Sequence, residues 1–102
     1  YNKQYTDVVA VFSMLADKDI SSVTDLLKTT VKDWFIASLN VPRAAPLHQL
    51  QDALQGQQVY EYGNIQQAFE DVLKQSNNNQ LILVCGSFHT LEAVWEYLEQ
   101  CQ

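Results

Sequence analysis

The chain has 102 residues, of which 47% are hydrophobic and 11% aromatic, a composition that favours one folded domain and excludes intrinsic disorder. Twelve Asp and Glu against six Lys and Arg give a net charge of −6, which disfavours binding to the phosphate backbone of nucleic acids. No apolar run approaches the roughly 18 residues that a membrane-spanning helix needs. We therefore expect a domain that binds neither nucleic acid nor membrane, and its use of only two cysteines favours the reducing cytoplasm.

The first half of the chain alternates between strand and helix patterns. Residues 8–12 form a continuous apolar run rich in β-branched residues, which is typical of a strand buried on both faces. Apolar residues are then spaced for one face of a helix over 20–27, which Asp19 or a following serine could cap. Residues 34–37 predict a second strand, followed by a loop that holds Arg43 between two prolines.

The same alternation continues to the C-terminus. The pattern predicts a helix over 47–54, a strand over 59–62, a helix over 65–73, a second fully apolar strand over 81–85 and a helix over 91–98. Strands that alternate with helices imply right-handed crossovers and a mainly parallel sheet covered on both faces. We therefore predict one α/β domain over residues 1–102, a three-layer Rossmann-like fold whose function lies in the loops at the carboxyl ends of the strands.

Cysteine, histidine and glycine usage excludes several kinds of site. Two cysteines are too few for a disulfide-rich secreted scaffold, and Cys85 ends an apolar run, which favours an inert thiol over a nucleophile. His48 and His89 are far apart and no Cys-x-x-Cys pair occurs, so we expect the chain alone to hold no metal. The three glycines form neither a dinucleotide fingerprint nor a phosphate loop.

The segment that follows the last predicted strand combines several features of an anion site. The chain turns through Gly86 into a helix, whose free N–H groups lie beside the hydroxyls of Ser87 and Thr90 and the imidazole of His89. Such a helix N-terminus suits a carboxylate or a phosphate. The structural alternative is that Ser87 or Thr90 caps the helix while His89 is an ordinary surface residue.

Five of the six cations fall into two groups, and the sixth, Lys3, lies in the N-terminal segment. Near the ends of predicted helices, where positive charge is stabilising, lie Lys28, Lys32 and Lys74. Lys18 and Arg43 instead follow predicted strands, on the same edge of the sheet as the 86–90 loop, and could meet an anionic ligand there. The alternative is that Lys18 balances Asp17 and Asp19 while Arg43 is a solvated residue of a proline-containing loop.

Three segments together resemble a known family. They are VFSMLADKD at 11–19, PRAA at 42–45 and VCGSFHT at 84–90. In this order they resemble the C-terminal domain of the Mur ligase family, and within it the bacterial bifunctional dihydrofolate synthases/folylpolyglutamate synthases. The resemblance covers nearly the whole chain. This sequence departs from the family where Ser13 and Ala44 replace residues that are often glycine.

The resemblance implies the C-terminal part of an ATP-dependent amide ligase of folate biosynthesis. ATP would phosphorylate the carboxylate of dihydropteroate or a folylpolyglutamate, and the amino group of L-glutamate would attack the acyl phosphate. By resemblance, Ser87 and His89 hold the incoming glutamate. ATP and Mg²⁺ would be held mainly by an N-terminal ATPase domain that this chain lacks, so the chain alone should be inactive. Lys18, Arg43 and Asp19 follow predicted strands and so lie at the same edge of the sheet. We therefore add them as contacts to anionic substrate or to that domain.

A second class of function fits an acidic α/β chain of this size, namely a receiver-like domain phosphorylated on a carboxylate, or another non-catalytic regulatory or binding module. Asn40 rather than a carboxylate follows the second predicted strand, and Tyr62 ends the third. No lysine follows the last strand. These positions disfavour a receiver domain but leave a non-catalytic binding domain open.

Overall fold

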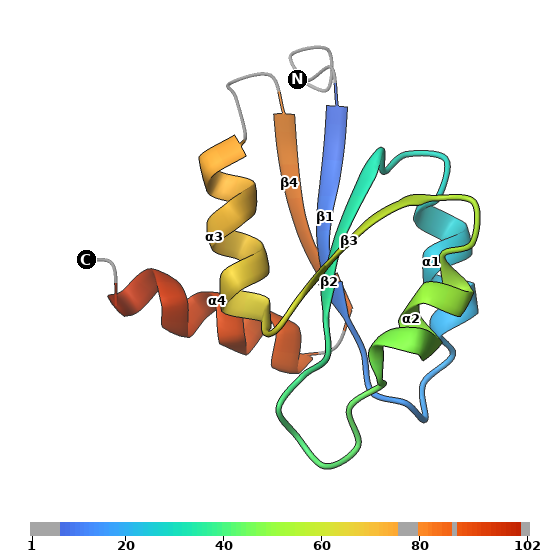
Figure 1. The fold of residues 1–102 in the computed structure, drawn as a ribbon, viewed down its shortest axis with the longest axis horizontal. Helices are drawn as coiled ribbons and strands as arrows, with labels where there is room; N and C mark the ends of the chain where they lie inside the picture. The colour runs from blue at the N-terminus through green and yellow to red at the C-terminus, as the bar shows by residue number, and fades with distance from the viewer. Residues whose placement is uncertain (1–6, 76–79, 87, 101–102) are drawn as a thin grey trace.

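The computed structural model of this chain describes residues 7–75, 80–86 and 88–100. In these ranges four strands alternate with four helices, as the sequence pattern predicts (Figure 1). In chain order they are β1 (Asp7–Ser13), α1 (Ile20–Leu27), β2 (Asp33–Ala37), α2 (Leu47–Ala53), β3 (Gln58–Tyr62), α3 (Ile65–Gln75), β4 (Gln80–Gly86) and α4 (Phe88–Gln100). The observed boundaries differ from the predicted ones by a few residues at most.

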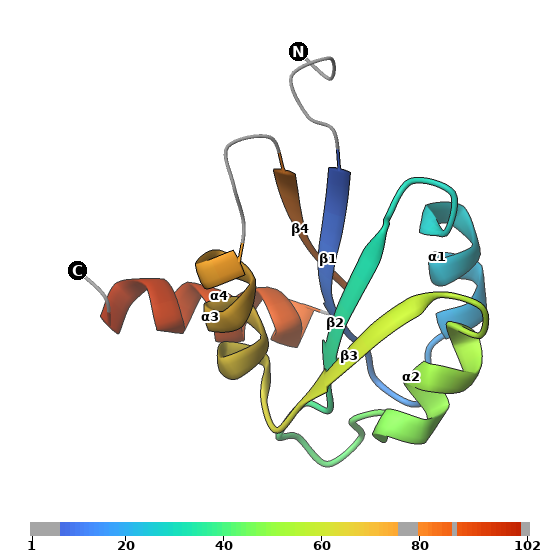
Figure 2. The same cartoon turned by 45° about the horizontal axis from the view of Figure 1, so that its top comes forward.

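The strands form one parallel sheet in the order β3-β2-β1-β4. In this register Val11 of β1 lies between Phe35 of β2 and Val84 of β4. Helices α1 and α2 cover one face of the sheet and α3 and α4 cover the other, as both views of the ribbon show (Figures 1 and 2). The predicted three-layer α/β architecture is therefore confirmed, and all four strands point their carboxyl ends to the same edge.

The core is divided into two halves by the sheet. Because successive side chains of a strand point to opposite faces, Val9 and Val11 of β1 face α3 and α4, whereas Ala10 and Phe12 face α1 and α2. Phe12 is fully buried and packs edge to face on Trp34, with ring centroids 5.4 Å apart. Strand β1 is thus buried on both faces, as its apolar run predicts.

Strand β4 is less buried than its equally apolar sequence suggests. It lies at the edge of the sheet, and the Leu81 side chain is 39% exposed whereas Val11 is fully buried. An apolar run can reveal that a strand is present, but it does not reveal which neighbours cover that strand. Burial of β4 depends on what lies beyond the edge.

The helices begin where sequence signals place them. Asp19 caps α1, and Asn64 accepts a hydrogen bond of 2.8 Å from the amide of Gln67 at the start of α3. Lys32 is not at a helix end as predicted, because α1 stops at Leu27; its ammonium lies 3.5 Å from the Asp7 carboxylate. None of the helices in the described ranges is both long and apolar enough to cross a membrane.

One polar contact ties the edge strand β3 to α3. The Tyr62 hydroxyl donates a hydrogen bond to the Asp71 carboxylate, which also accepts one of 2.8 Å from Gln75. Burial raises the pKa of Tyr62 above its usual 10.0, and the hydrogen bond to Asp71 adds to this effect. Neutral tyrosine is therefore the form that the folded chain favours.

We expect Tyr62→Phe to lower the free energy of unfolding by about 1–2 kcal/mol, because it removes a hydrogen bond to a charged acceptor. The stability that Tyr62 contributes should be complete below pH 10 and lost as the pH rises further, since the unfolded chain then releases the phenolic proton first. Urea unfolding of both proteins at neutral pH and above pH 10 measures the two effects. A difference that did not shrink with rising pH would contradict this role.

Candidate functional site

The loops after β1 and β2 are joined into one unit at the carboxyl edge. The amide of Ala16 donates a hydrogen bond of 2.7 Å to the carbonyl of Arg43, and Leu15 forms an antiparallel bridge with Ala44. From α2, the Gln49 side-chain amide donates to the Ala16 carbonyl at 3.1 Å. These bonds satisfy backbone groups that have no partner in the sheet, and they hold the two loops in one arrangement.

Arg43 lies in this unit but its charge is already paired. Its guanidinium contacts the Asp17 carboxylate at 2.8 Å, with 69% of the arginine side chain and 50% of the aspartate side chain exposed. The prediction that these two loops share one edge of the sheet is confirmed. The pairing of Arg43 with Asp17 was not predicted. An exposed pair of this kind adds little stability, so Arg43 stays accessible to a stronger anionic partner.

Asp19 and Lys18 have different environments although they are adjacent. The Asp19 carboxylate accepts hydrogen bonds from the Ser22 hydroxyl at 2.6 Å and the Ser22 amide at 3.2 Å, and these lower the pKa of Asp19. Asp19 is therefore occupied as the N-cap of α1. Lys18 is exposed, lines a hollow of about 290 Å³ with Gln49 and Asp52, and has no ion pair within the described part of the chain.

The predicted glutamate-binding loop is described only at its two ends. Ser87 lies outside the described residues, and of His89 the structure describes the backbone, within α4, but not the side chain. Thr90, which the sequence analysis also placed at an anion site, is fully buried and donates a hydrogen bond of 2.9 Å to the Ser13 carbonyl. Its hydroxyl therefore anchors α4 to β1 and does not face a ligand.

Gly86 makes the turn from β4 into α4 possible. Its φ of 112° is in a region that other residues rarely adopt, and a Cβ added there would lie 1.9 Å from the carbonyl oxygen of Ser13. Together with the Thr90 hydrogen bond, this contact presses the beginning of α4 against the end of β1. The free N–H groups of the first helical turn are thereby held at the carboxyl edge of the sheet.

Ser13 is a polar residue at a position that is often glycine in the family that this sequence resembles, and nothing else in the sequence draws attention to it. It is fully buried, and its hydroxyl has no hydrogen-bond partner among the described residues. A buried hydroxyl without a partner costs roughly 1–3 kcal/mol. The residue lies directly beside Gly86 and the predicted loop. No local signal distinguishes it, because serine at a strand end is otherwise ordinary.

A second hollow also lies at the carboxyl edge of the sheet, but its charged lining residues are negative and would repel an anion. It measures about 360 Å³ and is bounded by the loop after β2, the start of α3 and one side of α4. Glu92 and Glu96 line it together with Asn40, Asn64 and Gln66, and no cation is among its lining residues in the described ranges. No residue that lines this hollow was predicted to be a site residue.

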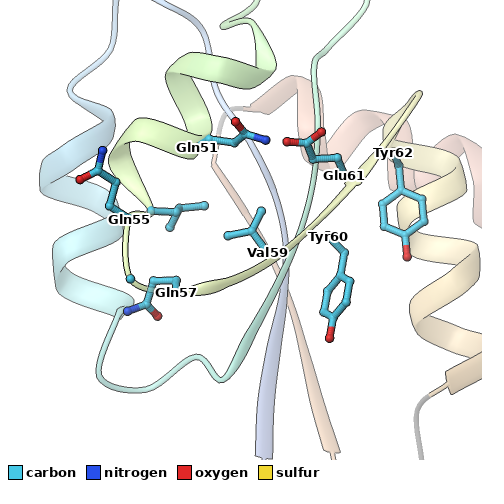
Figure 3. A pocket seen from close by; sticks show the side chains of 9 residues that line it. Gln51, Gln55, Gln57, Val59, Tyr60, Glu61 and Tyr62 are labelled. Atoms are coloured by element: carbon cyan, nitrogen blue, oxygen red, sulfur yellow. The ribbon is translucent and has the colours of Figure 1, made fainter.

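A third hollow, of about 610 Å³, lies along β3 and includes no predicted site residue. Figure 3 shows Gln51 of α2 and Glu61 of β3 at its rim, with Tyr60 and Tyr62 pointing away from α2. Strands β3 and β4 are the two edge strands of the sheet. This hollow is therefore separated from the β4–α4 turn by the width of the sheet.

The described part of the chain offers neither a cluster of metal ligands nor a reactive thiol. No group of three or more His, Cys, Asp or Glu side chains there could hold a metal ion. Burial raises the pKa of the Cys85 thiol to about 11. Because the thiolate is the reactive form, Cys85 is a poor nucleophile at neutral pH, in line with the interpretation of its sequence context.

Comparison with known proteins gives a consistent result. The family model described as Mur ligase, glutamate ligase domain, matches residues 1–88. The dihydrofolate synthase/folylpolyglutamate synthase of Escherichia coli (strain K12) is 37% identical over 92 residues, which cover 90% of this chain and 21% of that protein. This chain therefore spans about one fifth of the length of that relative.

Solved structures resemble the chain over almost its whole length. Escherichia coli FolC in complex with ADP superposes with a TM-score of 0.87 at 35% identity, covering 94% of this chain and 23% of that one. A bifunctional folylpolyglutamate synthase/dihydrofolate synthase with Mn, AMPPNP and L-glutamate bound gives a TM-score of 0.83 at 32% identity, covering 91% and 22%. The observed fold is the one found in these enzymes.

Gly86→Ala should lower the free energy of unfolding by at least about 3 kcal/mol, because an added Cβ combines an unfavourable φ with a clash against the β1 backbone. The matched control is Gly56→Ala. Gly56 also has a positive φ, of 85°, but nothing lies within 4 Å of the position that a Cβ would take there, so we expect a loss of only about 1–2 kcal/mol. Chemical denaturation of the two variants measures the difference, and equal losses would show that the contact with Ser13 is not formed.

Proposed function

This chain belongs to the Mur ligase family through its glutamate ligase domain, and on that basis we propose that it is the C-terminal domain of an ATP-dependent amide ligase. The complete enzyme would add L-glutamate to dihydropteroate, to folylpolyglutamate or to both. The observation that carries this proposal is the 37% identity to a dihydrofolate synthase/folylpolyglutamate synthase over 90% of the chain. Membership of this family also leaves the receiver-like alternative without support.

The proposed reaction has two chemical steps. The γ-phosphoryl group of ATP passes to the carboxylate of the folate substrate, which gives an acyl phosphate and ADP. The amino group of glutamate then attacks the acyl carbon, a proton leaves that nitrogen, and inorganic phosphate departs as the amide forms. Because the chain covers about one fifth of its relatives, we assign the phosphate loop and metal ligands to an N-terminal domain of the same polypeptide. Bound ADP, AMPPNP and Mn in solved relatives support a nucleotide and a divalent cation for the complete enzyme.

The contribution of this domain would be to hold the incoming glutamate. The turn at Gly86 and the hydrogen bond from Thr90 to Ser13 fix the beginning of α4 at the carboxyl edge. Ser87 and His89 precede or occupy the first turn of that helix, where N–H groups and the helix dipole stabilise a carboxylate. We assign the glutamate contact to these two residues, supported by a solved relative that holds L-glutamate.

The charged residues of the neighbouring loops would have separate roles. Lys18, which has no ion pair in the described part of the chain, is the cation available to an anionic substrate or to the N-terminal domain. Arg43, held by Asp17, and Asp19, held by Ser22, would contact that domain while they keep their own loops in place. Backbone hydrogen bonds already hold the two loops together, so such contacts would need little further ordering of the loop backbone.

The test is to place Ser87→Ala and His89→Ala separately in the complete enzyme and to measure the KM for glutamate. Losing a hydrogen bond to a charged ligand costs about 1.5–3 kcal/mol, so we expect KM to rise at least about tenfold while the KM for ATP is unchanged. His48→Ala, at the exposed histidine of α2, is the control and should leave both constants as they are. Wild-type glutamate kinetics in both variants would refute the assignment of the pocket.

A further inference from the structure

Ser13 carries the one polar side-chain atom, among the described side chains, that is buried without a hydrogen-bond partner. Two other hydroxyls are equally buried, and both have partners. Thr24 Oγ1 lies within hydrogen-bond distance of two backbone carbonyls, at 3.1 and 3.3 Å, and Thr90 donates to the Ser13 carbonyl. Because folded proteins rarely leave a buried hydroxyl unpaired, the exception at Ser13 points to a partner from outside the described chain.

The Ser13 side chain lies on the face of the sheet that α4 covers. Side chains along a strand alternate between the two faces, and Val9 and Val11 of the same strand pack with side chains of α3 and α4. The neighbours of Ser13 in the sheet are Gly86 of β4 and, by the register of β1 with β2, Ala37. Neither has a polar side chain. A partner for the hydroxyl must therefore come from the space between the end of β1 and the first turn of α4.

The first turn of α4 brings further hydrogen-bond donors to this space. Thr90 fixes the turn to the Ser13 carbonyl at 2.9 Å, and the N–H groups of a first helical turn have no partner within the helix. The Ser13 hydroxyl and these N–H groups are therefore neighbouring donors that need an acceptor. A carboxylate only accepts, offers about four lone-pair sites and is stabilised by the helix dipole. It can satisfy both kinds of donor at once.

We propose that the Ser13 hydroxyl is a further contact of the glutamate site and donates a hydrogen bond to a carboxylate of the incoming amino acid. The inference rests on the function proposed above. It adds a residue of β1 to a site whose other assigned residues, Ser87 and His89, follow β4 in the sequence. Because the hydroxyl is already out of water, its bond to the ligand is formed without a further loss of hydration at Ser13.

The hydroxyl lies close to solvent although it is buried. Gly86, which pairs with Ser13, is exposed, and neighbouring strands of a sheet are only about 4.8 Å apart. The oxygen itself is covered, so the carboxylate reaches it by entering between the first turn of α4 and the end of β1. A ligand held by the N–H groups of that turn is already placed at this entrance.

A buried water molecule is the competing partner for the hydroxyl. The two partners predict opposite effects of Ser13→Ala on the protein without substrates. If the hydroxyl has no partner until glutamate binds, the substitution removes an unpaired buried group and stabilises the domain. If a water already bonds to it, the substitution leaves that water with fewer partners and destabilises the domain.

The test places Ser13→Ala in the complete enzyme. We expect the KM for glutamate to rise at least about tenfold, because a hydrogen bond to a charged ligand is lost, while the KM for ATP is unchanged. Without substrates, the amides of residues 8–12 in β1 should exchange with deuterium at least about fivefold more slowly than in the wild type, since they exchange only when this domain opens.

Thr24→Val is the matched control. Thr24 is as buried as Ser13, but its hydroxyl is bonded to carbonyls of α1 and α2, and valine has nearly the same shape as threonine. We expect both KM values to stay at the wild-type level. The β1 amides should exchange faster, because a bond within the chain is lost.

Three outcomes would overturn the inference. An unchanged KM for glutamate in Ser13→Ala, together with a raised KM in Ser87→Ala or His89→Ala, would refute the Ser13 contact and leave the proposed function standing. Faster exchange of the β1 amides in Ser13→Ala would assign the hydroxyl a structural role or a buried water. A complete enzyme that does not use glutamate would refute the proposed function and this inference together.

Discussion

The contact between Gly86 and the backbone of Ser13 is the constraint on which the functional edge depends. At the end of β4 the chain comes so close to β1 that a single added carbon would lie 1.9 Å from a carbonyl oxygen. This approach is possible only without a side chain, and it determines where α4 begins. The hydrogen bond from Thr90 then fixes the helix to the same residue of β1. The position of the proposed glutamate site follows from these two contacts.

The loops after β1 and β2 bring Lys18 and Arg43, two of the six cations of this acidic chain, to the carboxyl edge of the sheet. Its net charge of −6 is a property of the whole surface, whereas binding depends on the charges within a few ångströms of the ligand. Hydrogen bonds between the loops hold Arg43 beside Asp17, and Lys18 stays exposed nearby. In contrast, the hollow beside α3 and α4 presents Glu92 and Glu96. The edge is therefore divided into a region where cations and carboxylates are mixed and a region lined by carboxylates, a division that bulk composition does not reveal.

Much of the fold could be predicted because its signals are local. The run at 8–12, the helical spacing at 20–27 and the caps at Asp19 and Asn64 each depend on residues within a few positions. The partners in space were harder to foresee. Nothing local to Arg43 indicates that it pairs with Asp17, 26 positions earlier. In the same way, the hydroxyl of Thr90 looks like a candidate ligand contact until its partner, 77 positions away, is known.

The sequence by itself determined the number and kind of elements, their alternation, the parallel α/β class and the family, because periodicity and short motifs are carried by neighbouring residues. Tertiary structure decided the order of the strands. It placed the equally apolar β1 and β4 in different environments, one at the centre of the sheet and one at its edge. It also decided which polar groups are buried, as Ser13 and Thr90 are. The physical reason is that burial and pairing depend on distant segments meeting in space, which no local pattern encodes.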